Sequence, residues 1–157
     1  MRKHLTRFLL LTFVFSVVAA VDNTTFAQRR GPRGRVYTRS EVNELIKRAE
    51  DRSDRFVKSF DKSLDKSGLD GTKKEDRLNE RAKDLERAMD DLRHEFDRKE
   101  SYAETKPEMV RVLNTASGIN QVMLNRRMGG ETEQAWNALR TELNILASVY
   151  YLPRLRP

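Results

Sequence analysis

Residues 78–96 read LNERAKDLERAMDDLRHEF, and the apolar positions of this stretch decide the fold class. These positions recur at alternating spacings of four and three residues, which keeps one side of an α-helix facing a partner helix, as in a coiled coil. They are Leu78, Ala82, Leu85, Met89, Leu92 and Phe96. Apart from Ala88, every residue between them is polar or charged. A single helix cannot bury such a seam, so other amphipathic helices must pack against it.

Three further segments carry a similar pattern and can supply the partner helices. The predicted stripes are Val42, Leu45, Ile46, Ala49, Phe56, Phe60 and Leu64; Met109, Val112, Leu113, Ala116, Ile119 and Met123; and Trp136, Leu139, Leu143, Leu146 and Tyr150. We therefore expect an all-α fold over residues 38–152, a four-helix up-and-down bundle with two long and two shorter helices. Val110 and Leu124 widen the stripe of the third helix, which should be the least exposed of the four.

Capping motifs and turn residues predict where these helices begin and end. Three Thr-x-x-Glu motifs can satisfy the otherwise unpaired amides at helix starts. The motifs pair Thr38 with Glu41, Thr72 with Glu75, and Thr105 with Glu108. Lys99 interrupts the seam, so the second helix should end between Ser101 and Thr105, and Gly129 with Gly130 should end the third. Prolines follow the fourth helix, so residues 153–157 are predicted to form a disordered tail.

The composition favours helices that are held together by packing alone. Charged residues make up 35% of the 157-residue chain and hydrophobic residues 38%, with only seven Gly and four Pro. This balance is typical of long amphipathic helices. Cysteine is absent, which excludes disulfides, thiolate zinc sites, iron–sulfur clusters and a lipoprotein anchor.

Residues 1–27 are typical of a secretory signal peptide. Three basic residues within positions 1–7 precede an uncharged run over residues 8–20, which is shorter than the roughly 20 apolar residues of a membrane span. Cleavage is expected after Ala27, with Ala20 as the alternative site, and an uncleaved anchor is the competing interpretation. We therefore expect an exported protein, periplasmic or extracellular, whose mature form carries a net charge of about +5.

Residues 28–37 follow as a flexible basic arm, too rich in Arg, Gly and Pro to fold alone. The candidate polyanion-binding residues are Arg29, Arg30, Arg33, Arg35 and Arg39. Guanidinium groups suit phosphate and carboxylate, so the candidate partners are an anionic envelope component or an acidic protein. Nucleic acid is disfavoured because no aromatic residues are interleaved with the arginines. A solvated tail without a partner is the alternative interpretation.

A second basic feature lies in the first predicted helix. Three four-residue repeats stack Lys58, Lys62 and Lys66 in one row, which Asp61 and Asp65 should relieve. We interpret these repeats as a short local duplication.

Metal and cofactor sites are not expected. An EF-hand calcium loop with Gly68 at its sixth position would place Lys74 where the loop needs a bidentate glutamate. His94, the one histidine of the mature chain, forms Asp91-x-x-His94, but a di-iron site needs two such pairs with further carboxylates. His94 is therefore predicted to lie on the surface.

The last predicted helix carries the pattern Trp136-x-x-Leu139-Arg140-x-Glu142-Leu143-Asn144-x-Leu146-Ala147-x-x-Tyr150. Together with an export signal and a mature chain that starts Gln-Arg-Arg, this pattern resembles uncharacterised exported helical proteins of bacteria. The resemblance covers about a fifth of the chain. It implies a helical fold and an exported location, and it implies no activity.

No catalytic motif accompanies these helices, because a phosphate loop, a nucleophile elbow and a zinc-binding helix motif are all missing from the sequence. We expect a non-enzymatic binding or adaptor module for an envelope polyanion or an acidic protein. The alternative is a self-associating structural or chaperone-like envelope protein. Ile145, Val149 and Leu152 form a second stripe on the last helix that would either meet another copy or be covered by Val36 and Tyr37 of the arm.

Overall fold

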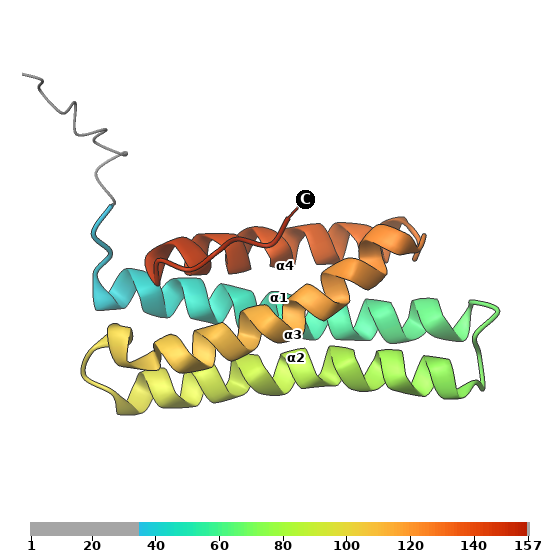
Figure 1. Ribbon diagram of the computed structural model, residues 1–157, viewed down its shortest axis with the longest axis horizontal. Coiled ribbons are helices and arrows are strands. Elements are labelled where there is room, and N and C mark those ends of the chain that lie inside the picture. The colour runs from blue at the N-terminus through green and yellow to red at the C-terminus, as the bar shows by residue number, and fades with distance from the viewer. Residues whose placement is uncertain (1–34, 157) are drawn as a thin grey trace, which may run out of the picture. The chain divides into compact units, whose positions relative to one another are not determined.

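The computed structural model describes residues 35–156, and every regular element in that range is helical (Figure 1). α1 spans Arg39–Asp65, α2 Lys73–Arg98, α3 Lys106–Asn125 and α4 Gly130–Val149, and a short 3-10 turn, η1, occupies Tyr102–Thr105. The helices have 27, 26, 20 and 20 residues. The predicted all-α fold class is confirmed for this part of the chain. The predicted signal peptide and residues 28–34 of the arm lie outside the described residues.

α1 is the helix around which the others pack, because it contacts both α2 and α4 along its length. Consecutive helices run in opposite directions, and α3 crosses obliquely from the end of α2 to the start of α4 (Figure 1). α2 contacts α3 extensively, whereas the contact between α3 and α4 is much smaller. The α3–α4 side is therefore the one where the helices cover each other least.

The core is built from the predicted stripes. All six seam residues of α2 and all seven stripe residues of α1 are buried, and so are the five of α4. Aromatic rings join α1 to α4, since the Phe56 ring centroid lies 5.2 Å from that of Phe60 and 5.1 Å from that of Trp136. Burying a side chain of this size contributes roughly 1.5–3 kcal/mol to folding.

Truncating the seam of α2 tests this core. Leu85→Ala or Leu92→Ala should lower the free energy of unfolding by about 2–5 kcal/mol, because each leucine is fully buried. Urea denaturation followed by circular dichroism measures the change. Lys83→Ala on the exposed side of the same helix is the control and should change the stability by about 0.5 kcal/mol or less. An unchanged midpoint for both leucine variants would show that α2 does not contribute to a shared core.

Only the first of the three predicted capping motifs forms completely. At the start of α1, the amide of Glu41 donates to Thr38 Oγ1 at 3.2 Å and the amide of Thr38 donates to Glu41 Oε2 at 2.9 Å. At the start of α2, Thr72 Oγ1 accepts from the amide of Glu75, but the Glu75 carboxylate accepts from the amide of Gly71. The second motif is therefore only half a capping box.

The third predicted capping motif does not form, and α2 ends earlier than predicted. Lys99 is already extended, so the chain leaves the helix after Arg98 and enters η1, where Ser101 supplies the cap. Thr105 is buried, and its Oγ1 lies 2.8 Å from the hydroxyl of Tyr150. A buried hydroxyl requires a hydrogen-bonding partner, and Thr105 serves that need of Tyr150 instead of capping α3.

α3 is more exposed than predicted. Its main stripe is buried from Met109 to Ile119, but Met123 is only half-buried. Val110 is 37% exposed and Leu124 is 57% exposed. The expectation that α3 would be the least exposed helix was wrong, because its wide apolar side faces the region where α3 and α4 make little contact.

α4 ends in a reversal that the sequence did not predict. The amide of Leu152 donates to Ala147 O at 2.7 Å and the amide of Tyr151 donates to Ser148 O at 3.3 Å, a pattern that commonly ends helices. Tyr151 adopts φ of 55°, in the left-handed region where this position usually holds Gly. The reversal sends the chain back along α4.

Residues 153–156 are consequently ordered, whereas the sequence predicted a disordered tail. Leu155 is 8% exposed. Its amide donates to Asn144 Oδ1 at 2.7 Å, and its carbonyl accepts from Asn144 Nδ2 at 3.2 Å. Proline prevents a helix here but not an extended segment, and the burial of Leu155 favours that segment. Pro157 lies outside the described residues.

Replacing Tyr151 tests the left-handed turn. Tyr151→Gly should raise the free energy of unfolding by up to ~1 kcal/mol, because Gly adopts positive φ without the steric cost that a side chain pays. The Tyr151 side chain is 78% exposed, so little packing is lost. Thermal and urea denaturation measure the difference. Ser148→Gly, inside the helix, is the matched control and should destabilise, and destabilisation by Tyr151→Gly would contradict the assignment of the turn.

Candidate functional site

α1 carries a row of basic side chains along the side that adjoins α4. Neighbours in the row are three or four residues apart, which places them on one face of the helix. The row consists of Arg48, Arg52, Arg55, Lys58 and Lys62 of α1 and of Lys66, which directly follows the helix. It includes the three lysines that the sequence singled out. No side-chain ion pair within residues 35–156 joins those lysines to Asp61 or Asp65, so the predicted relief by these aspartates is not formed.

The first two arginines of the row hold α4 against α1. Glu142 of α4 is only 5% exposed, and its Oε1 lies 3.4 Å from Arg48 Nε and 3.1 Å from Arg52 Nη2. Arg52 Nη1 also donates to the carbonyl of Ala138 at 2.8 Å. A buried carboxylate is costly without a charged partner. Arg48 and Arg52 therefore stabilise the contact between α1 and α4.

The remaining cations line two adjoining hollows between α1 and α4. The larger has a volume of about 650 Å³, and Arg55, Lys58 and Lys62 face Gln134, Ala135 and Ala138 across it. The smaller, of about 380 Å³, lies where α4 begins and adds Lys66 and Arg127. We call the five side chains Arg55, Lys58, Lys62, Lys66 and Arg127 the basic groove.

Acidic side chains are scarce along the basic groove. Glu131 is the one carboxylate that lines the hollows, and its Oε2 lies 4.0 Å from Lys62 Nζ. Arg55 donates to the carbonyl of Asp51 in its own helix. As far as the structure describes the chain, Arg55, Lys58, Lys66 and Arg127 have no carboxylate within 4.0 Å. The charge of the groove is thus largely uncompensated.

The start of α4 adds to the positive potential of the groove. Gly129 precedes the helix with φ of 90°, a conformation that favours glycine, and no side chain caps the first turn. The amides at a helix start carry a partial positive charge. Anionic groups placed in the smaller hollow would therefore meet lysine, arginine and amide dipoles together.

The predicted arginines of the arm divide into two groups. Arg29, Arg30 and Arg33 lie outside the described residues. Arg35 Nη2 lies 2.6 Å from Glu41 Oε1, and its guanidinium stacks over Tyr37. Arg39 is the first residue of α1 rather than part of an arm.

Arg39 connects the start of α1 to the end of α2. Its Nη2 donates to Phe96 O at 2.7 Å and its Nη1 to Glu100 O at 3.2 Å, while the guanidinium lies 4.4 Å from the centroid of the Phe96 ring. These bonds satisfy carbonyls at the C-terminal end of α2. Arg39 is therefore engaged within the fold and not presented to a partner.

The predicted interface stripe is covered by the chain itself. Val149 is 3% exposed, and Ile145 and Leu152 are half-buried against the core. Tyr37 lies beside Ile145, whereas Val36 is 84% exposed. Tyr37 and the returning tail together cover this side of α4, so only part of the predicted cover by the arm is formed.

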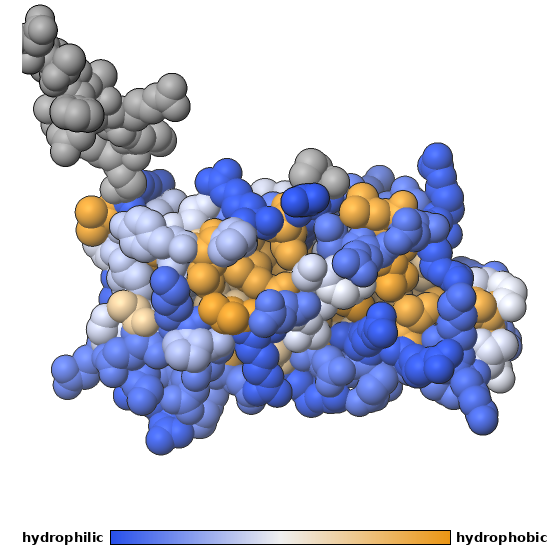
Figure 2. All heavy atoms as spheres, viewed as in Figure 1, coloured by the Kyte–Doolittle hydropathy of each residue, from blue (hydrophilic) through white to orange (hydrophobic). Residues whose placement is uncertain are grey.

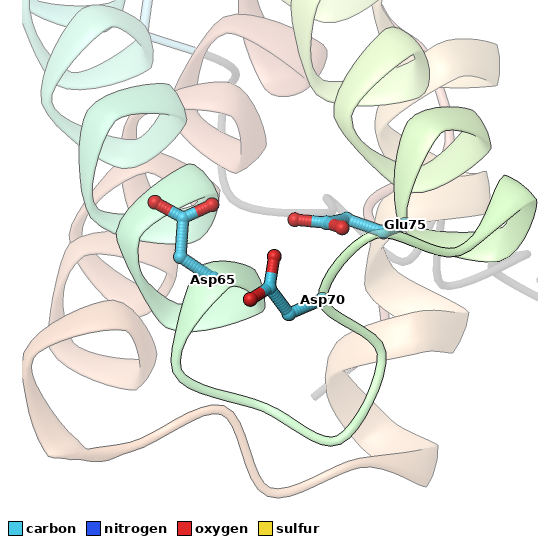
Figure 3. A group of neighbouring side chains, drawn as sticks. All are labelled: Asp65, Asp70 and Glu75. Carbon is cyan, nitrogen blue, oxygen red and sulfur yellow. The ribbon is translucent and has the colours of Figure 1, made fainter.

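The turn between α1 and α2 gathers three carboxylates that the sequence did not combine (Figure 3). One oxygen each from Asp65, Asp70 and Glu75 lies within 4.8 Å of the others, and only Glu75 is buried. Glu75 did not enter the EF-hand prediction, because the position of Glu75 does not match a ligand position of that loop. Glu75 Oε2 already accepts from the amide of Gly71 at 2.6 Å, and the two aspartates are exposed, so we assign no metal to this cluster. His94 is exposed, as predicted.

Acidic residues gather on the opposite side of α1, next to α2. Burial raises the pKa of Glu50, with Asp90 and Asp54 raising it further against the influence of Arg93. Burial also raises the pKa of Asp90, and the charge of Asp54 adds to the effect. At 100° per residue, Glu50 lies about 140° and Asp54 about 100° from the middle of the basic row. Both carboxylates are thus turned away from the centre of the basic row.

Removing Asp54 tests the acidic side. Asp54→Asn should lower the pKa values of Glu50 and Asp90 towards their ordinary range, which carboxyl NMR titration measures. Carboxylates with raised pKa values favour folding while protonated and oppose it as the pH rises through the folded pKa. The variant should thus be more stable than the wild type at pH 7, with the gain fading in acid. Asp61→Asn is the control, and equal pKa values in the wild type and Asp54→Asn would contradict the assignment.

Comparisons with known proteins found no relative of this chain. No family model, no curated protein and no solved structure matches the chain. Between Arg35 and Arg156, no helix has both the length and the apolar character to cross a membrane.

Proposed function

We propose that this protein is an exported four-helix up-and-down bundle that works by binding an anionic chain rather than by catalysis. The proposed binding site is the basic groove between α1 and α4. The proposed partner is an envelope polyanion, or an acidic protein segment, that presents successive phosphate, sulfate or carboxylate groups.

One observation supports this proposal above the others. Four cations of the basic groove have no carboxylate within 4.0 Å, and they line adjoining hollows of about 650 and 380 Å³. Bringing like charges together on one face is unfavourable for the isolated protein. A ligand that supplies the missing negative charge would remove that cost and release bound counterions.

The shape of the groove favours a chain over a flat membrane surface. Its cations lie along a hollow between two helices, where a narrow ligand can approach them from more than one side. The neutral side chains of Gln134, Ala135 and Ala138 form the α4 side of the hollow and would not repel an anion. Arg29, Arg30 and Arg33 of the predicted arm would add non-specific attraction to the same partner.

Charge reversal tests the groove. In the mature protein, Arg55→Glu combined with Lys58→Glu should weaken binding to a soluble polysulfated polysaccharide by about tenfold or more at low salt, since unit charges 4 Å apart in water interact by ~1 kcal/mol. Binding should also weaken as salt is added. Titration calorimetry at two salt concentrations measures both effects.

A control with the same change of net charge separates the groove from general attraction. Arg77→Glu combined with Lys83→Glu alters two exposed cations of α2 and should leave most of the affinity intact. Equal losses for the two double variants would contradict a groove. Polyglutamate and anionic vesicles serve as alternative ligands, and stronger binding to vesicles than to either soluble chain would contradict the proposed partner. A form that begins at Tyr37 measures the contribution of the arm.

A further inference from the structure

The C-terminal segment lies in the α3–α4 groove in the way that a bound peptide would. Residues 152–156 are extended and belong to no helix or strand. The single peptide unit of Leu155 both donates to and accepts from the side-chain amide of Asn144. An amide that pairs with a peptide unit in both directions reproduces the bonds that a neighbouring strand would make. α4 therefore holds the segment by its backbone.

A second set of bonds holds the next residue. The carbonyl of Arg156 accepts from Asn120 Nδ2 at 3.0 Å and from Arg140 Nη1 at 3.3 Å. Asn120 is 6% exposed, and its Oδ1 accepts from Trp136 Nε1 at 3.1 Å, which fixes the direction of its amide. α3 and α4 thus each provide an oriented donor for an extended backbone that runs between them.

Few side chains of the segment contact the groove. Leu155 is buried and Leu152 is half-buried, whereas Pro153, Arg154 and Arg156 are exposed. Arg154 Nε donates to Ser148 Oγ at 2.9 Å. Backbone bonds are available to any extended peptide, and a single pocket for leucine adds a modest requirement. Many sequences with one suitably placed leucine could make the contacts that the segment makes.

The groove has further hollows beside the segment and past Arg156. Val110 and Leu113 line a hollow of about 210 Å³ beside residues 152–155. Past Arg156, Leu124 and Trp136 line a second hollow of about 450 Å³. Figure 2 shows apolar residues along this face, where α3 and α4 lie in Figure 1, with charged residues around them. The two exposed apolar residues of α3, Val110 and Leu124, thus line one of these hollows each.

The second hollow has a charge preference. Arg126, Arg127 and Arg140 line it, against one carboxylate, Glu133. Within the described residues none of these three arginines has a carboxylate within 4.0 Å. A peptide that places acidic residues directly after its leucine would pair with them, which the protein's own segment, with Arg156 at that point, does not do.

We propose that the groove between α3 and α4 is a binding site for extended peptides that carry a leucine followed by acidic residues, and that residues 152–156 occupy it as an internal competitor. A segment tethered by a short linker faces its site at an effective concentration of about mM. A partner must therefore outcompete the tethered segment, and the acidic residues supply the extra attraction. The site lies between α3 and α4, whereas the basic groove lies between α1 and α4, and Arg127 lines the adjoining ends of both.

The full chain with Leu155→Asp tests the proposal, because it removes the one buried side chain of the competitor. The probe is a labelled peptide with the sequence of residues 151–155 followed by three glutamates. The variant should bind this probe about tenfold more tightly than the wild type, and adding Asn144→Ala should abolish the gain. Trp136 fluorescence should report binding, because Asn120 joins its indole to the bound backbone.

Matched controls define the specificity. Arg156→Gln changes only an exposed side chain of the segment and should bind the probe as the wild type does. A probe with aspartate in place of the leucine that corresponds to Leu155 should not bind, and Arg55→Glu with Lys58→Glu should leave probe binding unchanged. Equal binding by the wild type and Leu155→Asp, or of the two probes, would overturn the proposal. Wild-type dimers that disappear in Leu155→Asp would also overturn it, in favour of exchange of the segment between two copies.

Hydrogen exchange in the wild type decides the matter if Leu155→Asp does not fold. A competitor must leave its groove without global unfolding, so the Leu155 amide should exchange much faster than the amide of Leu143 in α4. Equal exchange rates would show that the segment is a fixed part of the fold and would overturn the proposal.

Discussion

The whole structure depends on α1 being buried on two sides at once. Its apolar stripe meets α2 on one side, and through Phe56 it meets Trp136 of α4 on the other. Glu142 strengthens the second contact, because its buried carboxylate is satisfied only when Arg48 and Arg52 of α1 are in place. α3, in contrast, packs extensively against α2 alone. Its small contact with α4 leaves space that the chain fills with its own C-terminal segment.

Much of the fold could be predicted from the sequence, because helical periodicity depends on neighbouring residues alone. The seam of residues 78–96 is buried at every predicted position. The predictions failed where a distant residue competes for a local group. Thr105 fits a capping motif by sequence, yet its hydroxyl is taken by Tyr150, and Lys99 ends α2 where periodicity allowed several further residues. Tyr151 gave no signal for a turn that usually requires Gly.

The candidate sites could be predicted only in part. The row of Lys58, Lys62 and Lys66 is visible in the sequence, but the hollow beside it exists only because α4 packs there and brings Arg127. Arg39 looked like part of a basic arm, although its guanidinium fits the carbonyls at the end of α2. The pairing of Asn144 with Leu155 depends on a chain reversal, which no periodicity describes.

The separation of Arg48 from Glu142 along the chain has a kinetic consequence. These residues are 94 positions apart, whereas α1 and α2 are joined by a short turn. Closing a long loop costs more entropy than closing a short one, so α4 is expected to dock after α1 and α2 have paired. Chains are synthesised at roughly 5–20 residues per second, so several seconds separate the completion of α1 from that of α4. During this interval the side of Phe56 that will meet Trp136 has no partner, and the incomplete chain exposes an apolar helix face to its surroundings.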